Sequence, residues 1–172
     1  MTPAGSVRRL SVKPQTKGER GLPKRAVSEL RITSAGAEGD YNHYRTTKVQ
    51  GDPDLAILVL TEEVIETLRR EGWPVEPGDL GENLTLSGVA EASLKPGARL
   101  TIGEVVLEVS QACDPCSETY VLPYVGQDKG PEFVRTLVGR RGWFTRVLSP
   151  GKIATGDGVT VESPSAPSLR SG

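Results

Sequence analysis

Frequent glycine and proline residues constrain the fold of this chain more than any other sequence feature. Its 172 residues include 20 glycines and 13 prolines, which interrupt short runs rich in β-branched residues. The run 55–60 is continuously apolar, which indicates a strand buried on both faces. We interpret the following runs as strands: 6–13, 27–33, 55–60, 99–110 (two strands broken at Gly103) and 146–161 (a hairpin and a further turn).

Two segments carry helical periodicity. Residues 61–72 begin with Thr61, a candidate N-cap, and residues 130–139 carry Pro131 in the first turn and end at Gly139. Strands and helices do not alternate regularly, so a doubly wound sheet is not expected. The pattern predicts a mainly β, closed or partly closed β-barrel with a few helices.

The length of the chain predicts one domain. A chain of this size buries one substantial core and is short for two. We expect the domain to cover residues 1–162. The segment 163–172 is small, polar and proline-containing, which predicts a disordered tail.

Charge and hydropathy exclude several classes of protein. The 21 basic and 22 acidic residues give a formal net charge of -1, whereas binders of nucleic acid or membrane surfaces usually carry a basic excess. No apolar run approaches the roughly 18 residues of a membrane span, and the first residues lack the apolar core of a secretory signal. We therefore expect a cytoplasmic protein with reduced thiols and no nucleic-acid or membrane partner.

The cysteines Cys113 and Cys116 are separated by two residues in "VSQACDPCSETY" (109–120). A structural zinc site needs more ligands than these two and His43 provide. A thioredoxin-type motif requires a βαβ frame, which the surrounding pattern does not match. A reducing compartment disfavours a permanent disulfide. Two interpretations remain open: small apolar side chains in a core, or an accessible thiol in a loop at a strand end.

Three further stretches concentrate polar side chains. The stretch "EGDYNHYR" (38–45), read as a loop, groups hydrogen-bonding side chains suited to a polar or phosphorylated ligand. The stretch "PGDLGENLTLSG" (77–88) consists of turns that lead into a short strand. The stretch "GRRGWFTRVLSPGKIATGD" (139–157) collects positive charge, and we expect its arginines to face outward while Trp143 and Phe144 pack inside. The candidate ligand-binding residues are Asp40, His43, Arg45, Glu82, Asn83, Arg140, Arg141 and Arg146.

The order of these stretches along the chain resembles the MOSC domain, named for the C-terminal domain of molybdenum-cofactor sulfurases. The resemblance runs from about Val7 to Val161, and its most specific parts are "PGDLGENLT" and the "PC" that follows a β-hairpin. The chain is most similar to the small stand-alone bacterial form. The resemblance implies a single-domain barrel of the MOSC, or pyruvate-kinase β-barrel, type.

The resemblance places Cys116 at the cysteine position of the family. In larger members that cysteine holds sulfur as a persulfide or ligates the molybdenum of the pterin cofactor, because a thiolate is both a nucleophile and a soft ligand. Adjacent arginines or His43 would favour the thiolate. Cys113 has a lesser role, either as a resolving thiol or as an inert neighbour.

The function implied is that of a sulfur carrier or reductase component associated with molybdenum cofactor (molybdopterin). Its partners would be a small anionic cofactor or substrate and a sulfur-donor or electron-transfer protein. The chain carries no aminotransferase-like domain, so no pyridoxal phosphate is expected on it. The alternative is a binding module that delivers the cofactor or another anion to a partner without turnover. A third reading, a structural domain with a buried cysteine, predicts slow reaction of both thiols.

Overall fold

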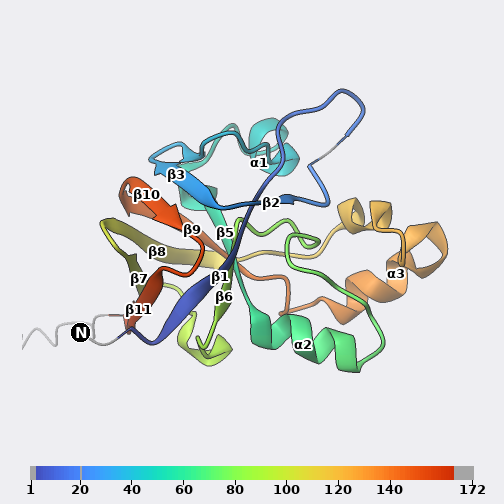
Figure 1. The fold of residues 1–172 in the computed structure, drawn as a ribbon. Helices are drawn as coiled ribbons and strands as arrows, with labels where there is room; N and C mark the ends of the chain where they lie inside the picture. Colours follow the sequence, from blue (N-terminus) through green and yellow to red (C-terminus); the bar gives the residue numbers. More distant parts are fainter. Residues whose placement is uncertain (1–2, 20, 165–172) are drawn as a thin grey trace, which may run out of the picture.

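A closed β-barrel occupies the centre of the molecule (Figure 1). It closes because the last strand of the sheet also pairs with β1, where Gly5 lies opposite Val159. The mainly β, barrel-like fold predicted from the sequence is therefore confirmed. The computed structural model describes residues 3–19 and 21–164, and within them seven strands form the barrel in the order β11 (Gly158–Glu162), β7 (Arg99–Ile102), β8 (Val105–Ala112), β9 (Trp143–Ser149), β5 (Ile57–Thr61), β6 (Leu84–Ser87) and β1 (Gly5–Val12).

Smaller elements flank the barrel. Strand β2 (Arg25–Val27) extends the sheet beyond β1. A separate sheet combines β10 (Gly151–Ala154), β3 (Glu29–Thr33) and β4 (Gly36–Ala37). Short 3-10 helices are η1 (Pro53–Leu55), η2 (Glu91–Ser93) and η3 (Ser117–Val121).

The two predicted helices are confirmed with shifted ends. Helix α2 (Glu62–Arg70) begins where the Thr61 side chain accepts a hydrogen bond from the Val64 amide. It connects β5 to β6, which pair in parallel and therefore need a crossover. Helix α3 (Gly126–Thr136) begins before the predicted start at 130. In Figure 1 these two helices lie on one side of the barrel.

A third helix, α1 (His43–Thr47), lies in the stretch that the sequence pattern predicted as a loop. The Asn42 side chain caps it by accepting a hydrogen bond from the Arg45 amide at 2.9 Å. The helix is too short for apolar periodicity to reveal it, and none of its residues is buried. The loop prediction is corrected here, and the cap was the local signal available.

Strand β5 is buried along its whole length, as its apolar run predicts. Ile57 and Val59 point into the barrel core. Leu60 packs outside the barrel with the residues of α2 and α3. Leu58 packs in a third cluster with Cys113 and Phe144. One strand thus holds the barrel, the two helices and the cysteine loop together.

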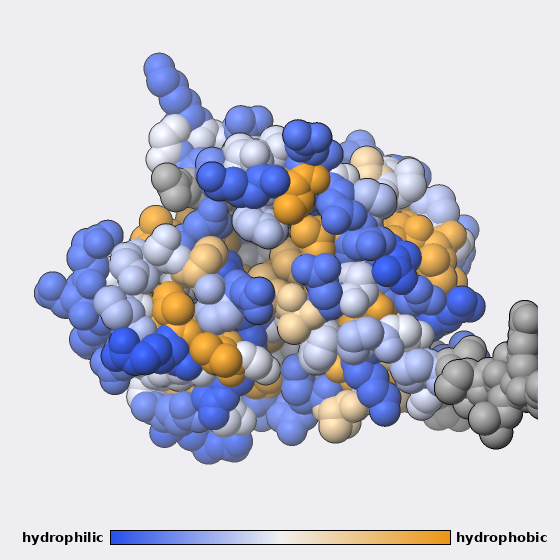
Figure 2. All heavy atoms as spheres, turned by 180° about the vertical axis from the view of Figure 1, so that it is seen from behind, coloured by the Kyte–Doolittle hydropathy of each residue, from blue (hydrophilic) through white to orange (hydrophobic). Residues whose placement is uncertain are grey.

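The surface is largely hydrophilic on the side opposite to that of Figure 1, with apolar side chains in small groups (Figure 2). Among the described residues, the exposed large hydrophobic side chains are Tyr44, Val121, Val138 and Leu148. None of the helices in that part of the chain combines the length and apolar character needed to cross a membrane. Of the predicted disordered tail, residues 165–172 lie outside the described residues.

Alanine substitutions at Gly139 and Gly142 would measure how tightly the barrel wall is packed beside the cysteine loop. Gly142 and Gly139 both have positive φ, at 91° and 74°. A Cβ added to Gly142 would lie 2.5 Å from the Val59 carbonyl oxygen, whereas one added to Gly139 would meet no atom within 4 Å. We expect Gly139→Ala to cost about 1 kcal/mol of unfolding free energy from backbone strain alone. Gly142→Ala should cost about 2 kcal/mol more, because the wall must shift.

Urea-induced unfolding of both variants and the wild type measures this difference. Equal losses in the two variants would show that the wall beside Val59 relaxes freely.

Candidate functional site

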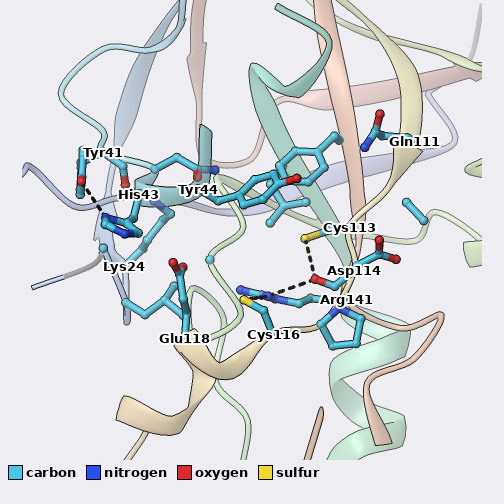
Figure 3. A pocket seen from close by; sticks show the side chains of 18 residues that line it. Lys24, Tyr41, His43, Tyr44, Gln111, Cys113, Asp114, Cys116, Glu118 and Arg141 are labelled. Carbon is cyan, nitrogen blue, oxygen red and sulfur yellow. Dashed lines mark hydrogen bonds between the residues drawn. The ribbon is translucent and has the colours of Figure 1, made fainter. Parts of the chain in front are cut away.

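A cavity of about 280 Å³ lies where the end of β8 meets α1 and the β1–β2 connection (Figure 3). Segments far apart in the sequence line it. The lining residues are Gly21, Leu22, Lys24, residues 41–44, Leu58, Gly81, residues 111–116, Glu118, Arg141 and Phe144. The volume lies near the lower end of the range of small-molecule pockets, which begins at roughly 300 Å³.

Cys116 lines this cavity beside a buried arginine. The Arg141 Nη1 atom donates a hydrogen bond to Cys116 Sγ at 3.0 Å and one to the Asp114 carbonyl at 3.3 Å. The Arg141 Nε atom donates to the Leu80 carbonyl at 3.4 Å. Figure 3 shows the guanidinium lying against the Cys116 sulfur. The cation therefore offers a charge-assisted hydrogen bond to a thiolate at this position.

Arg141 stays positively charged despite its burial. Only 6% of the residue is exposed. Burial acts to lower its pKa, but the hydrogen bond to Cys116 and the negative charges that the neighbouring Cys113, Cys116 and Glu118 can carry together raise it by more, so the pKa lies above its ordinary value. No ion pair between Arg141 and a carboxylate occurs among residues 3–19 and 21–164. The negative charge of Glu118, which lines the same cavity, and a thiolate or a bound anion would balance this charge.

Cys113 has a different environment. It is 6% exposed and packs against Leu55, Leu58 and Phe144. Burial raises the pKa of its thiol to about 11, so the thiol is protonated at neutral pH. Both cysteines are free thiols, one buried and one partly exposed. Of the two interpretations that the sequence left open, the buried apolar side chain describes Cys113 and the accessible thiol describes Cys116.

A second buried cation, Lys24, lines the cavity and is held by a polar network. Its Nζ atom contacts Asp40 Oδ1 at 2.7 Å and donates to the Tyr41 carbonyl at 3.1 Å. Asp40 Oδ2 accepts from Asn83 Nδ2 at 2.9 Å, and Asn83 Oδ1 accepts from the Leu58 amide at 3.1 Å. Asp40 and Asn83 therefore stand behind the cavity wall and position Lys24.

His43 lines the cavity with Tyr41 and Tyr44. The Tyr41 hydroxyl forms a hydrogen bond with His43 Nδ1 at 3.0 Å. If the hydroxyl donates, the other ring nitrogen carries the proton. The sequence prediction that His43 lies at a ligand site agrees with this position, and its role stays a prediction.

Three of the predicted ligand-binding arginines lie outside the cavity. Arg45 donates to the carbonyls of residues 35, 51 and 52 and so fixes the connection around α1. Arg140 contacts both carboxylate oxygens of Glu71 at 2.8 Å. Arg146 contacts Asp54 at 2.9 Å and Glu108. Carboxylates or carbonyls from other segments already satisfy these three side chains, so the structure does not bring them together with Arg141, and their ligand-binding role stays a prediction.

The expectation that the late arginines face outward is likewise wrong for Arg141, which points inward. Conversely, sequence reasoning did not select several residues that line the cavity. Lys24 stands in a basic loop with no local pattern that distinguishes it from its neighbours. Glu118 follows Cys116 by two positions, and this closeness was the available signal. The cavity residues missed are Lys24, Tyr41, Tyr44, Gln111 and Glu118.

Glu82 is fully buried just behind the cavity, next to Gly81 in its wall. Its Oε2 atom accepts a hydrogen bond from the Thr85 hydroxyl at 3.1 Å. Its Oε1 atom has no hydrogen-bond partner among the described residues. Burial raises the pKa of this carboxyl from 4.5 to about 7. Glu82 therefore does not line the cavity, and a ligand-binding role for it stays a prediction.

Comparison with known proteins agrees with this arrangement. The MOSC domain profile matches residues 46–160. The chain belongs to the MOSC domain family. It is 33% identical over 132 residues to the protein YiiM of Escherichia coli strain K12, covering 73% of this chain and 56% of that protein. It is 31% identical over 163 residues to the uncharacterized protein YflK of Bacillus subtilis strain 168, covering 84% of this chain and 66% of that protein.

The fold of this MOSC domain is also that of a solved structure. The crystal structure of the YuaD protein from Bacillus subtilis superposes with a TM-score of 0.78 and 21% sequence identity, covering 94% of this chain and 97% of that chain. The sequence matches therefore span between half and two thirds of the curated relatives YiiM and YflK, and the superposition covers nearly all of the crystallised YuaD chain.

The unequal environments of the two cysteines predict unequal reactivity. We expect iodoacetamide at pH 8 to alkylate Cys116 in the native protein. Cys113 should react slowly until the protein unfolds or the pH nears 11, because burial shields its thiol and raises its pKa to about 11. Mass spectrometry of peptides quenched over time measures both rates. Slow labelling of both thiols would instead support the structural reading of the domain.

Glu82 predicts a pH-dependent stability. Its pKa is higher in the folded protein, at about 7, than its ordinary value of 4.5, so the folded state binds the proton more tightly. Its contribution is complete below pH 4.5 and is lost as the pH rises through 7. The loss amounts to up to about 3 kcal/mol. Glu82→Gln should abolish this part of the pH dependence, measured by urea unfolding from pH 5 to 8.5. An unchanged pH profile in the variant would assign it to other groups.

Proposed function

We propose that this MOSC domain performs its chemistry at Cys116, as a sulfur carrier or as a reductase component that works with molybdenum cofactor. The observation that carries the proposal is the 3.0 Å contact between Arg141 Nη1 and Cys116 Sγ inside a cavity. Within the described residues Arg141 forms no ion pair with a carboxylate, so it can give a charge-assisted hydrogen bond to a thiolate at Cys116, the form of cysteine that reacts and that binds metals.

As a sulfur carrier, the Cys116 thiolate would attack the outer sulfur of a donor persulfide. A new sulfur–sulfur bond forms on Cys116, the sulfur–sulfur bond of the donor breaks, and the donor leaves as a thiolate. The product is a Cys116 persulfide, and no external oxidant or reductant is consumed. Arg141 would stabilise the negative charge on Cys116 before the transfer and on its terminal sulfur afterwards.

The cavity residues also fit a molybdenum cofactor. Among the described residues, no group of three or more His, Cys, Asp or Glu side chains is placed to hold a metal ion. A metal at Cys116 would therefore bring most of its ligands with it, as a pterin-bound metal does. Cys116 would supply a soft sulfur ligand, and Arg141 and Lys24 would bind anionic oxygens. When bound, the cofactor supplies two-electron redox chemistry.

The size of the cavity restricts how such a cofactor is held. A volume of about 280 Å³ accommodates the reacting end of a pterin cofactor or a small anion. The rest of a larger ligand would lie at the mouth, beside the exposed Tyr44. We further propose a cytoplasmic location, where free thiols remain reduced, and a sulfur-donor or electron-transfer protein as the partner.

The main test is the removal of the reactive sulfur. Cys116→Ser should abolish persulfide loading and molybdenum content while the fold survives, because serine preserves the shape of the side chain and lacks the soft nucleophile. Mass spectrometry and metal analysis of protein from a cofactor-making host measure both quantities. Cys113→Ser is the matched control and should keep most of both, since Cys113 is buried with a protonated thiol. Equal loading in Cys116→Ser and wild type would refute the proposal.

The second candidate is a binding module that delivers an anionic cofactor without turnover. Two buried cations, Arg141 and Lys24, line the same cavity and support it. Calorimetry with molybdopterin on the wild type and on Cys116→Ser separates the two candidates. Unchanged affinity in the variant favours the module, and a large loss favours chemistry at the sulfur.

A further inference from the structure

Both buried cations of the cavity depend on one short loop. The Leu80 carbonyl accepts the hydrogen bond from Arg141 Nε at 3.4 Å. The Gly78 carbonyl accepts from the Lys24 backbone amide at 3.0 Å. The loop 78–83 therefore contacts the side chain of Arg141 and the backbone of Lys24, so a shift of this loop would disturb both residues.

Glu82 connects this loop to the barrel. Its side chain is fully buried, and it reaches the Thr85 hydroxyl on β6 at 3.1 Å. The next residue, Asn83, is buried as well and binds the Leu58 amide of β5. The loop is thus anchored at its end by two polar side chains that face the barrel wall, one an amide and the other a carboxyl.

The surroundings of Glu82 do not suit a carboxylate. Within residues 3–19 and 21–164, its Oε1 atom lacks a hydrogen-bond partner and no cation forms an ion pair with it. Backbone N–H groups of Gly78 and of Glu82 itself favour the ionised form, while the negative charge of Asp79 opposes it. Asp79 is in turn bound by the Tyr124 hydroxyl at 2.9 Å and faces Arg9.

These contacts lead to one inference about the site. We propose that Glu82, in its protonated form, is the positioning residue that holds the loop 78–83 against the barrel and so keeps Arg141 in place beside Cys116. A neutral carboxyl tolerates burial at this position, whereas an ionised one must gain water or move toward it. The raised pKa of Glu82, about 7, places this change near neutral pH.

The inference concerns the cavity of the proposed function but requires neither sulfur transfer nor metal binding. It predicts that proton binding at Glu82 and the reactivity of Cys116 are linked. Glu82→Gln keeps a neutral side chain of the same shape at every pH. The variant and the wild type should therefore behave alike at pH 5.5 and differ at pH 8.5, where only the wild type carries the charge.

The test measures the rate of Cys116 alkylation by iodoacetamide in both proteins from pH 5.5 to 9. The ratio of the variant rate to the wild-type rate cancels the ordinary pH dependence of a thiol. We expect this ratio to be near unity at pH 5.5 and to rise at least about fivefold by pH 8.5. A ratio that stays constant across the range would overturn the inference.

Glu91→Gln is the matched control. Glu91 is another partly buried glutamate that binds a threonine hydroxyl, Thr61, at 2.7 Å, and it also binds Trp143. It touches neither the loop 78–83 nor the cavity, so its ratio should stay near unity throughout. An equal rise in both variants would show that the effect is not specific to Glu82.

Hydrogen exchange supplies a readout that does not depend on the cysteine. In peptides covering residues 78–83, the wild type should exchange faster than Glu82→Gln at pH 8.5 and at the same rate at pH 5.5. Equal exchange at both pH values would refute the positioning role even if Cys116 proved unreactive.

If Glu82→Gln fails to fold, Thr85→Val serves instead. It removes the contact of Glu82 with β6, and faster exchange of the loop at pH 5.5 is then expected.

Discussion

The burial of β5 on both faces is the constraint on which the rest of this structure depends. Side chains that point inward from it, such as Val59, fill the barrel. Two side chains that point outward belong to other clusters: Leu60 packs against the helices α2 and α3, and Leu58 packs beside Cys113. Because successive residues of a strand face opposite sides, one buried strand of five residues couples the core to the cavity wall. The site is therefore attached to the most buried strand of the molecule.

The proposed chemistry of the site depends on one buried cation, the guanidinium of Arg141. Arg141 is buried without a carboxylate partner in the described part of the chain, and its hydrogen bonds go to carbonyls and to the Cys116 sulfur. A charge in such a place interacts strongly with its nearest neighbour. Arg140 instead pairs with Glu71 at the end of α2, and Arg146 on β9 pairs with Asp54 and Glu108.

Much of the fold could be predicted from local patterns. The run 55–60, the cap at Thr61 and the break at Gly103 all have direct counterparts in the structure. Helix α1 could not be predicted from periodicity, because it is short and fully outside the core. The candidate site was predicted in part: Cys116, His43 and Arg141 line the cavity, while Asp40 and Asn83 stand behind it.

The sequence by itself determined the periodic elements, the barrel class and the family resemblance that singled out Cys116. Only the tertiary structure decided which of the neighbouring residues Arg140 and Arg141 is buried, and which of the two cysteines is shielded. The physical reason is that periodicity is a local property, whereas desolvation and ion pairing depend on segments far apart in the chain. Lys24 illustrates this: its partner Asp40 and the cavity that it lines come from separate segments of the chain, which only the fold brings together.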